Sequence, residues 1–144
     1  MALAYIDTSA LVKLYVSEIG SDQVEAVIEE SQAKIVASVI AYPEAHAAFA
    51  KYLRDGKLTT KAHAKIVTAF NTDWQGINEV DVTPTVYRRA GALVAAHPQL
   101  RAMDAIHLSS ALEAQQYTDI LFMTYDENLQ LVAERMLPGR VWHE

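Results

Sequence analysis

The chain has 144 residues, of which 51% are hydrophobic and 21% charged, so it has the size and composition of one folded domain rather than of a disordered protein. It contains no cysteine, which excludes disulfides, thiolate metal sites and cysteine nucleophiles and fits a reducing cytoplasm. The net charge of −6 argues against non-specific coating of nucleic acid, which needs Lys and Arg, but not against an enzyme that recruits a cation through carboxylates.

The start of the chain does not resemble a targeting signal. The run Met1–Ile6 has no basic residues, and its apolar stretch ends at Asp7. No apolar stretch elsewhere is long enough to span a bilayer. The expected location is therefore the cytoplasm, with no membrane partner.

Short apolar runs alternate with segments of helical spacing along the whole chain. Capping residues mark several helix starts, among them Ser38, Thr59 or Thr60, and Thr83 with Pro84 just inside the helix. The predicted elements, in chain order, are a strand at 3–6, helices at 8–16 and 23–30, a strand at 34–37, helices from Ser38 to Arg54 and from Thr59 or Thr60 to Trp74, a strand at 79–82, helices at 83–97 and 101–116, a strand at 120–123, a helix at 127–136 and a possible edge strand at 141–142.

The strand–helix–helix pattern with short connections predicts an α/β fold. We expect a small parallel sheet of about four to five strands with helices on both faces. Internal repeats, low-complexity tracts and linkers are absent from the sequence. A single domain over residues 1–144 is therefore predicted.

Four of the eighteen acidic residues lie in apolar surroundings. A carboxylate in such a setting is costly unless it is paired, hydrogen-bonded or bound to a cation. The four are Asp7, Glu44, Asp104 and Asp126.

Topology predicts a common location for these carboxylates. Asp7 and Asp126 fall where an apolar strand gives way to a helix, and Glu44 and Asp104 fall in or near the first turns of helices. In open parallel sheets the crevice at the carboxyl ends of the strands binds ligands. Carboxylates that meet there would suit Mg²⁺ or Mn²⁺.

Each acid also has a purely structural interpretation. Asp7 and Asp126 are good helix N-caps, and Asp104 would interact favourably with the positive end of its helix dipole. Glu44 is the weakest candidate by position, because Pro43 must start or kink the helix. Only the four acids taken together favour a functional interpretation over a structural one.

At these residues the chain resembles the PIN-domain nucleases, specifically the VapC-type toxins of toxin–antitoxin pairs. Any one motif is weak, but the ordered set is specific and extends from Ala4 to about Val132. The matching segments are Tyr-Ile-Asp-Thr-Ser-Ala-Leu-Val-Lys-Leu-Tyr, Ala-Ser-Val-Ile-Ala-Tyr-Pro-Glu, Arg-Ala-Met-Asp-Ala-Ile-His-Leu-Ser-Ser-Ala-Leu and Phe-Met-Thr-Tyr-Asp.

The resemblance implies an acidic, Mg²⁺- or Mn²⁺-dependent site that cuts RNA. It makes Asp7 and Asp104 the leading metal ligands, with Glu44 and Asp126 completing the pocket. It also places the Thr124 hydroxyl at the pocket floor and Ser9, where many relatives have asparagine, near metal-bound water. Pro43 before Glu44 is a second departure from the family pattern.

The expected function is that of an endoribonuclease toxin in which a metal-activated water hydrolyses a phosphodiester. Its expected partners are RNA, a cognate antitoxin and a second copy of the chain in a homodimer. The alternative is a catalytically silent PIN-fold module that binds RNA or protein. A phosphotransferase that uses Asp7 as a covalent nucleophile is disfavoured. Haloacid-dehalogenase-like enzymes place a second aspartate two positions after the nucleophile, and here that position is Ser9. A dinucleotide-binding domain is disfavoured because no Gly-x-Gly-x-x-Gly follows the first strand.

Two further features have open interpretations. A basic cluster near Asp55 is a candidate rail for the RNA backbone or simply a solvated helix pair. His107, three residues after Asp104, is expected to be a hydrogen-bonded structural histidine rather than a metal ligand, because Mg²⁺ prefers oxygen. The basic cluster consists of Lys51, Arg54, Lys57, Lys61 and Lys65.

Overall fold

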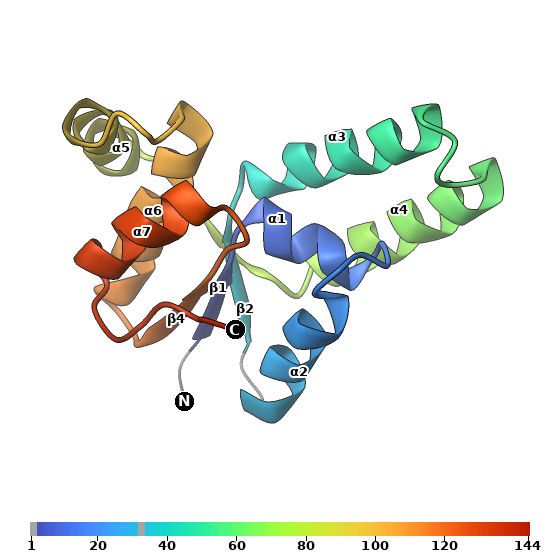
Figure 1. The fold of residues 1–144 in the computed structure, drawn as a ribbon, viewed down its shortest axis with the longest axis horizontal. Coiled ribbons are helices and arrows are strands. Elements are labelled where there is room, and N and C mark those ends of the chain that lie inside the picture. Colours follow the sequence, from blue (N-terminus) through green and yellow to red (C-terminus); the bar gives the residue numbers. More distant parts are fainter. Residues whose placement is uncertain (1–2, 32–33) are drawn as a thin grey trace.

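The computed structural model describes residues 3–31 and 34–144. Strands and helices alternate along the chain as expected for an α/β fold (Figure 1). The elements are β1 (Leu3–Ile6), α1 (Thr8–Leu11), the 3-10 turn η1 (Val12–Leu14), α2 (Ser21–Ser31), β2 (Ile35–Ser38), α3 (Ala41–Arg54), α4 (Thr60–Trp74), β3 (Asn78–Val80), α5 (Pro84–Ala96), α6 (Ala102–Gln115), β4 (Ile120–Met123) and α7 (Glu127–Met136).

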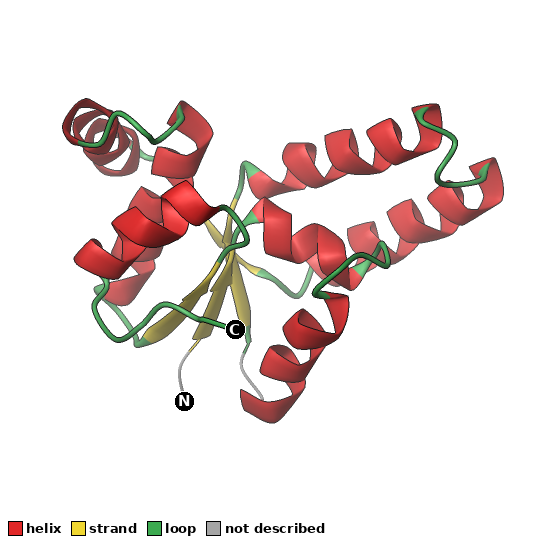
Figure 2. Cartoon of the chain, viewed as in Figure 1, coloured by secondary structure: helices red, strands yellow, loops and turns green. Residues whose placement is uncertain are grey.

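The strands form a parallel sheet in the order β3-β2-β1-β4, with helices on both faces (Figure 2). Leu3 to Ile6 of β1 pair in register with Ile120 to Met123 of β4. From β1 the chain first builds outward through β2 and β3, and it then returns to add β4 on the other side of β1. The strand order therefore reverses between β1 and β4, which is where open sheets of this kind bind ligands.

Alternation along β1 supplies both hydrophobic layers. Tyr5 packs in the layer formed with α5, α6 and α7, whereas Ala4 and Ile6 pack in the layer formed with α1 to α4. All three side chains are fully buried. This period of two, with both faces covered, explains why the strand reads as a continuous apolar run.

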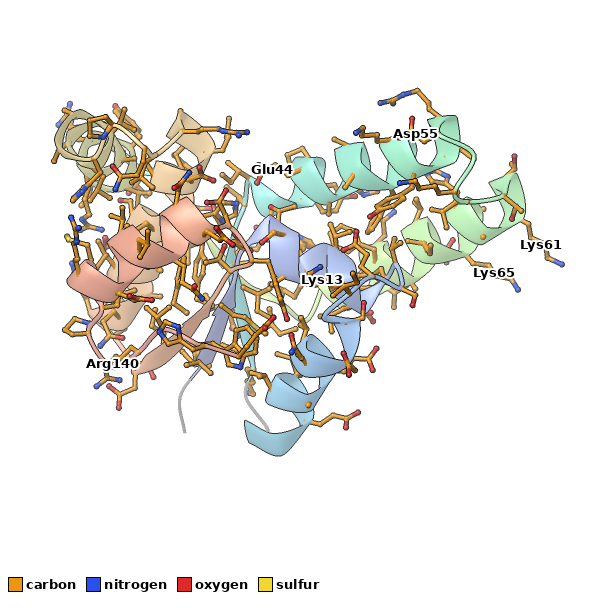
Figure 3. All side chains as sticks on the ribbon, viewed as in Figure 1. Lys13, Glu44, Asp55, Lys61, Lys65 and Arg140 are labelled. Atoms are coloured by element: carbon orange, nitrogen blue, oxygen red, sulfur yellow. The ribbon has the colours of Figure 1, made fainter. Side chains whose placement is uncertain are left out.

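Helices α3 and α4 form an antiparallel arm that extends from the side of the sheet (Figure 1). An aromatic cluster fills the interface: the fully buried rings of Phe49 and Phe70 lie edge to face, with centroids 5.4 Å apart. The predicted basic cluster is exposed on this arm, with Lys61 and Lys65 near its free end (Figure 3). Aromatic packing therefore joins the two helices of the arm and is continuous with the hydrophobic layer on the sheet.

Some boundaries differ from those predicted. Ser38 is not a helix cap: it is the buried last residue of β2, its hydroxyl accepts from the Ile40 N–H at 3.3 Å, and α3 begins at Ala41. The helix predicted at 8–16 is divided into α1 and η1. The predicted last strand is reduced to a single parallel bridge between Val141 and Phe122.

Candidate active site

Asp7 lies directly after β1, at the switch point, which is the place between β1 and β4 where the strand order reverses. It is the N-cap of α1. Its side chain is only 4% exposed. One carboxylate oxygen, Oδ1, accepts from the Ser9 hydroxyl at 2.6 Å and from the Ala10 N–H at 3.1 Å. The predicted cap is therefore present, but a cap does not by itself require so deep a burial of the carboxylate.

The loop after β4 reaches Asp7 from the neighbouring strand. The Thr124 hydroxyl donates to Asp7 Oδ2 at 2.5 Å and accepts from the Asp126 N–H at 3.0 Å. The Tyr125 N–H donates to the Ser9 hydroxyl at 3.0 Å. Ser9 and Thr124, which were predicted to be near the site, thus tie the ends of β1 and β4 to the same carboxylate.

Asp126 is the N-cap of α7 and lies half-buried beside this loop. Its Oδ1 accepts from the Leu129 N–H at 2.9 Å. Among the described residues its Oδ2 has no hydrogen bond, so one oxygen of Asp126 is held and the other is available.

Glu44 lies in the first turn of α3 and turns back towards α1. Its Oε1 accepts from the Thr8 hydroxyl at 2.7 Å and lies 2.8 Å from Nε2 of His107. Pro43 does not disturb this pose, because it is the third residue of the helix, where a backbone N–H has no partner within the helix. The Glu44 N–H bonds normally to the Ile40 carbonyl at 3.2 Å.

Asp104 occupies the first turn of α6, as predicted, and is half-buried. Its Oδ2 accepts from the Arg101 N–H at 3.3 Å. Partial burial raises the pKa of Asp104, and the negative charges of Asp126 and Asp7 raise it further. Asp104 therefore lies within electrostatic reach of Asp7 and Asp126.

Burial also raises the pKa of Asp7, although His107, Ser9 and Thr124 oppose the shift. Burial acts on Glu44 in the same direction, but hydrogen bonds from His107 and Thr8 outweigh it and lower its pKa. The carboxylates thus differ: Glu44 is stabilised as an anion by its donors, whereas Asp7 and Asp104 would gain from an added positive charge.

The described residues do not contain a group of at least three Asp, Glu or His side chains close enough to hold a metal ion. The donor set still fits a hard cation. It consists of carboxylates, and within the described part of the chain Glu44, Asp104 and Asp126 each have one oxygen held by a hydrogen bond and one without.

Replacing Thr124 with valine is expected to lower the free energy of unfolding by about 2 kcal/mol, because two polar groups lose their buried partner. The side chain is 1% exposed, and valine preserves its shape. Urea unfolding measures the change. Replacing Thr68, which is exposed on α4, with valine is the matched control and should have little effect. Equal stability of the two variants would contradict the role of the Thr124 hydroxyl.

His107 is 3% exposed and hydrogen-bonded, as predicted, but its connection to Glu44 was not predicted. The Tyr5 hydroxyl, 3.0 Å from Nδ1 of His107, was missed altogether. The only sequence signal for Tyr5 was its place in an apolar strand, two residues before Asp7.

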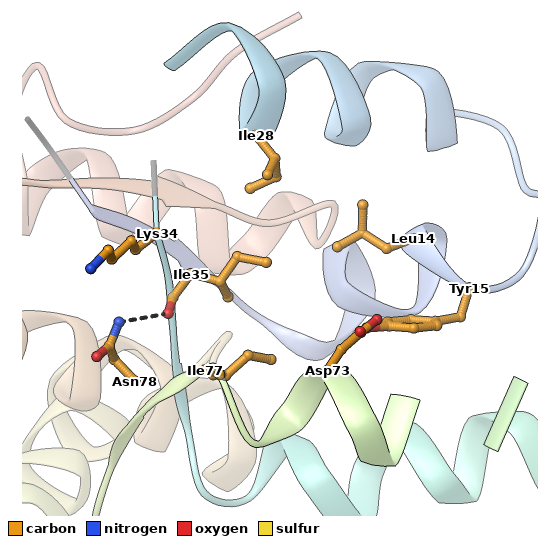
Figure 4. A pocket seen from close by; sticks show the side chains of 9 residues that line it. Leu14, Tyr15, Ile28, Lys34, Ile35, Asp73, Ile77 and Asn78 are labelled. Carbon is orange, nitrogen blue, oxygen red and sulfur yellow. Dashed lines mark hydrogen bonds between the residues drawn. The ribbon is translucent and has the colours of Figure 1, made fainter. Parts of the chain in front are cut away.

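A cavity of about 600 Å³ lies away from these carboxylates. Ile35 and Asn78, near the amino ends of β2 and β3, line it together with Leu14 and Ile28 (Figure 4). The carboxylates lie at the opposite, carboxyl end of the sheet.

In the described part of the chain no helix has the length and apolar character needed to cross a membrane.

Comparison with known proteins places the chain among relatives of one kind. The PIN domain family model matches residues 4–135. Ribonuclease VapC45 and Ribonuclease VapC49, both of Mycobacterium tuberculosis, are each 40% identical over 112 residues, which is 78% of this chain and 76% of the relative.

Solved structures share the fold at lower sequence identity. A toxin–antitoxin complex from Klebsiella pneumoniae matches with a TM-score of 0.65 at 20% identity, covering 97% of this chain and 96% of the other. VapBC2 from Rickettsia felis, bound to a DNA fragment from its promoter, gives 0.62 at 13% identity and 98% of both chains. FitAcB from Neisseria gonorrhoeae gives 0.67 at 14% identity, covering 98% and 97%. These likenesses confirm the predicted α/β architecture.

Proposed function

The chain belongs to the PIN-domain family and to its VapC-type ribonucleases, the toxins of toxin–antitoxin pairs, and we propose that it hydrolyses RNA at the carboxylates around Asp7. The observation that supports this location is the buried Asp7 carboxylate at the reversal of strand order, with Asp104 and Asp126 in electrostatic reach. A carboxylate so disfavoured by burial is typical of a functional site.

We propose Asp7 and Asp104 as the leading ligands for Mg²⁺ or Mn²⁺, with Asp126 and Glu44 completing the acidic pocket. When bound, the cation supplies a Lewis acid that activates the attacking water and neutralises charge on the phosphate. Ser9 and Thr124 orient Asp7 through their hydroxyl groups, and the Thr124 hydroxyl also ties Asp126 to it. A carboxylate of the pocket accepts the proton of the water.

The partners follow from the same assignment. The similar structure from Klebsiella pneumoniae is of a toxin–antitoxin complex. We infer that this chain, too, is inhibited by a cognate antitoxin and that it forms a homodimer. Co-expression with the small protein encoded beside it should relieve growth arrest.

The direct test of the proposed function is cleavage of RNA by the purified chain in Mg²⁺ or Mn²⁺. The wild type should cut and EDTA should abolish cutting, while Asp104→Asn should fold normally and lose activity. Asp55→Asn, which alters an exposed carboxylate at the end of α3, is the matched control and should remain active. Full activity of Asp104→Asn, or RNA binding without cleavage by the wild type, would contradict the proposal, and the second result would favour a silent binding module.

A further inference from the structure

A line of buried polar groups leads from the interior of the sheet to Glu44. Tyr5, fully buried on β1, places its hydroxyl 3.0 Å from Nδ1 of His107. The other ring nitrogen, Nε2, lies 2.8 Å from Glu44 Oε1. The imidazole therefore bridges the core and the acidic pocket, and its edge-to-face contact with the Tyr5 ring helps to fix its orientation.

The carboxylate determines the direction of the hydrogen bonds. An ionised carboxylate oxygen can only accept, so the 2.8 Å contact between Nε2 of His107 and Glu44 Oε1 requires the ring hydrogen to be on Nε2. In a neutral imidazole the other nitrogen is then an acceptor, so Nδ1 accepts from the Tyr5 hydroxyl. Burial raises the pKa of Tyr5 well above its ordinary value, so the hydroxyl keeps the hydrogen that it donates.

Oε1 of Glu44 has a second donor besides Nε2 of His107. The Thr8 hydroxyl donates to the same carboxylate oxygen at 2.7 Å. Two donors thus hold Oε1 and leave Oε2 without a hydrogen bond among the described residues.

We propose that His107, oriented by Tyr5, is a positioning residue that holds Glu44 so that its free oxygen faces the acidic pocket. This inference rests on the proposed function, because it concerns the same site. Outer partners of this kind orient a ligand and tune its basicity, and their loss costs about 10- to 100-fold in metal affinity or activity.

The test uses the full chain, with Mn²⁺ as the metal probe. His107→Leu is expected to lower kcat by about 10- to 100-fold and to weaken Mn²⁺ binding by about 10-fold, with little change in the KM for RNA. His107→Gln, whose amide can still donate to Glu44, should recover most of both losses. Tyr5→Phe should weaken Mn²⁺ binding by less than His107→Leu.

A matched control separates positioning from folding. Ser109, two residues from His107 on α6, is fully buried and donates to the Val86 carbonyl at 2.7 Å. Ser109→Ala breaks a buried hydrogen bond on the same helix without touching Glu44, so kcat and Mn²⁺ affinity should remain within about twofold of wild type. A His107→Leu variant that matches Ser109→Ala in both quantities would overturn the positioning role.

Nitrogen NMR provides a readout that is independent of activity. In the metal-free wild type the His107 ring should carry its hydrogen on Nε2 and have an unprotonated Nδ1, and a hydrogen on Nδ1 would overturn the proposed direction.

Failure of the positioning role can be distinguished from failure of the proposed function. A wild type that does not respond to EDTA contradicts the proposed function, whereas an inactive Asp7→Asn beside a fully active His107→Leu contradicts only the positioning role.

Discussion

Asp7→Asn is expected to reduce metal-dependent RNA cleavage by at least about 10³-fold, equivalent to about 4 kcal/mol of transition-state stabilisation. The substitution preserves size and leaves an acceptor for the Ser9 hydroxyl and the Ala10 N–H. It removes the negative charge that a cation at the site would need. Single-turnover cleavage in Mg²⁺ and Mn²⁺ measures the loss, and full activity would contradict the assignment of Asp7.

The same variant is expected to be more stable than the wild type when metal is absent. Burial raises the pKa of Asp7, so the ionised carboxyl destabilises the folded state at neutral pH, and this cost disappears as the pH falls below the ordinary carboxyl range. Asparagine removes the cost of the buried charge, and its amide nitrogen can donate to the Thr124 hydroxyl oxygen in place of the bond that Asp7 Oδ2 accepts. Urea unfolding in EDTA at neutral pH measures the gain in stability, and Asp55→Asn should show no gain. A less stable Asp7→Asn would contradict burial as the dominant effect.

Phe70→Ala is expected to lower the free energy of unfolding by about 3–5 kcal/mol, a large part of the roughly 5–15 kcal/mol that stabilises a typical domain. Phe70 is fully buried, and its ring contacts those of Tyr15, Phe49 and Trp74 at centroid distances of 5.2, 5.4 and 5.6 Å. The substitution leaves a cavity between the two helices of the arm. Urea unfolding followed by circular dichroism measures the loss.

An exposed position on the same helix supplies the control. Thr68→Ala should change stability by no more than about 0.5 kcal/mol. The folded fraction of Phe70→Ala should still cleave RNA, because Thr8 and His107 hold Glu44 at the start of α3, away from the cavity. A loss no larger than that of Thr68→Ala would show that the arm does not depend on its aromatic cluster.

Features with local causes were predicted well. The strand at Leu3–Ile6 follows from its apolar run, and the starts of α4 and α5 follow from Thr59 and Thr83, whose hydroxyl groups accept from the Ala62 and Val86 N–H groups. Ser38 was misassigned because the same residue type caps helices and ends strands. Its burial in the sheet decided between the two, and burial is not a local property.

In the candidate site, too, the features with local causes could be predicted and those that depend on tertiary contacts could not. Composition and pattern singled out Asp7, Glu44, Asp104 and Asp126, because carboxylates in apolar surroundings are visible in a sequence. The pose of Glu44 could not be predicted, because the histidine that holds it is 63 residues away in the chain. Pro43 suggested a kink, but at the third helical position it removes no hydrogen bond.

The sequence by itself determined which residues are the candidates for the chemistry, where the four strands lie and which family the chain resembles, since these depend on residue type, spacing and order. Only the tertiary structure decided how Thr124 and Asp7 meet across the switch point, and how Tyr5 and His107 fix Glu44. Those contacts join residues 117, 102 and 63 positions apart, so they exist only once parallel strands and the helices between them have packed into one sheet.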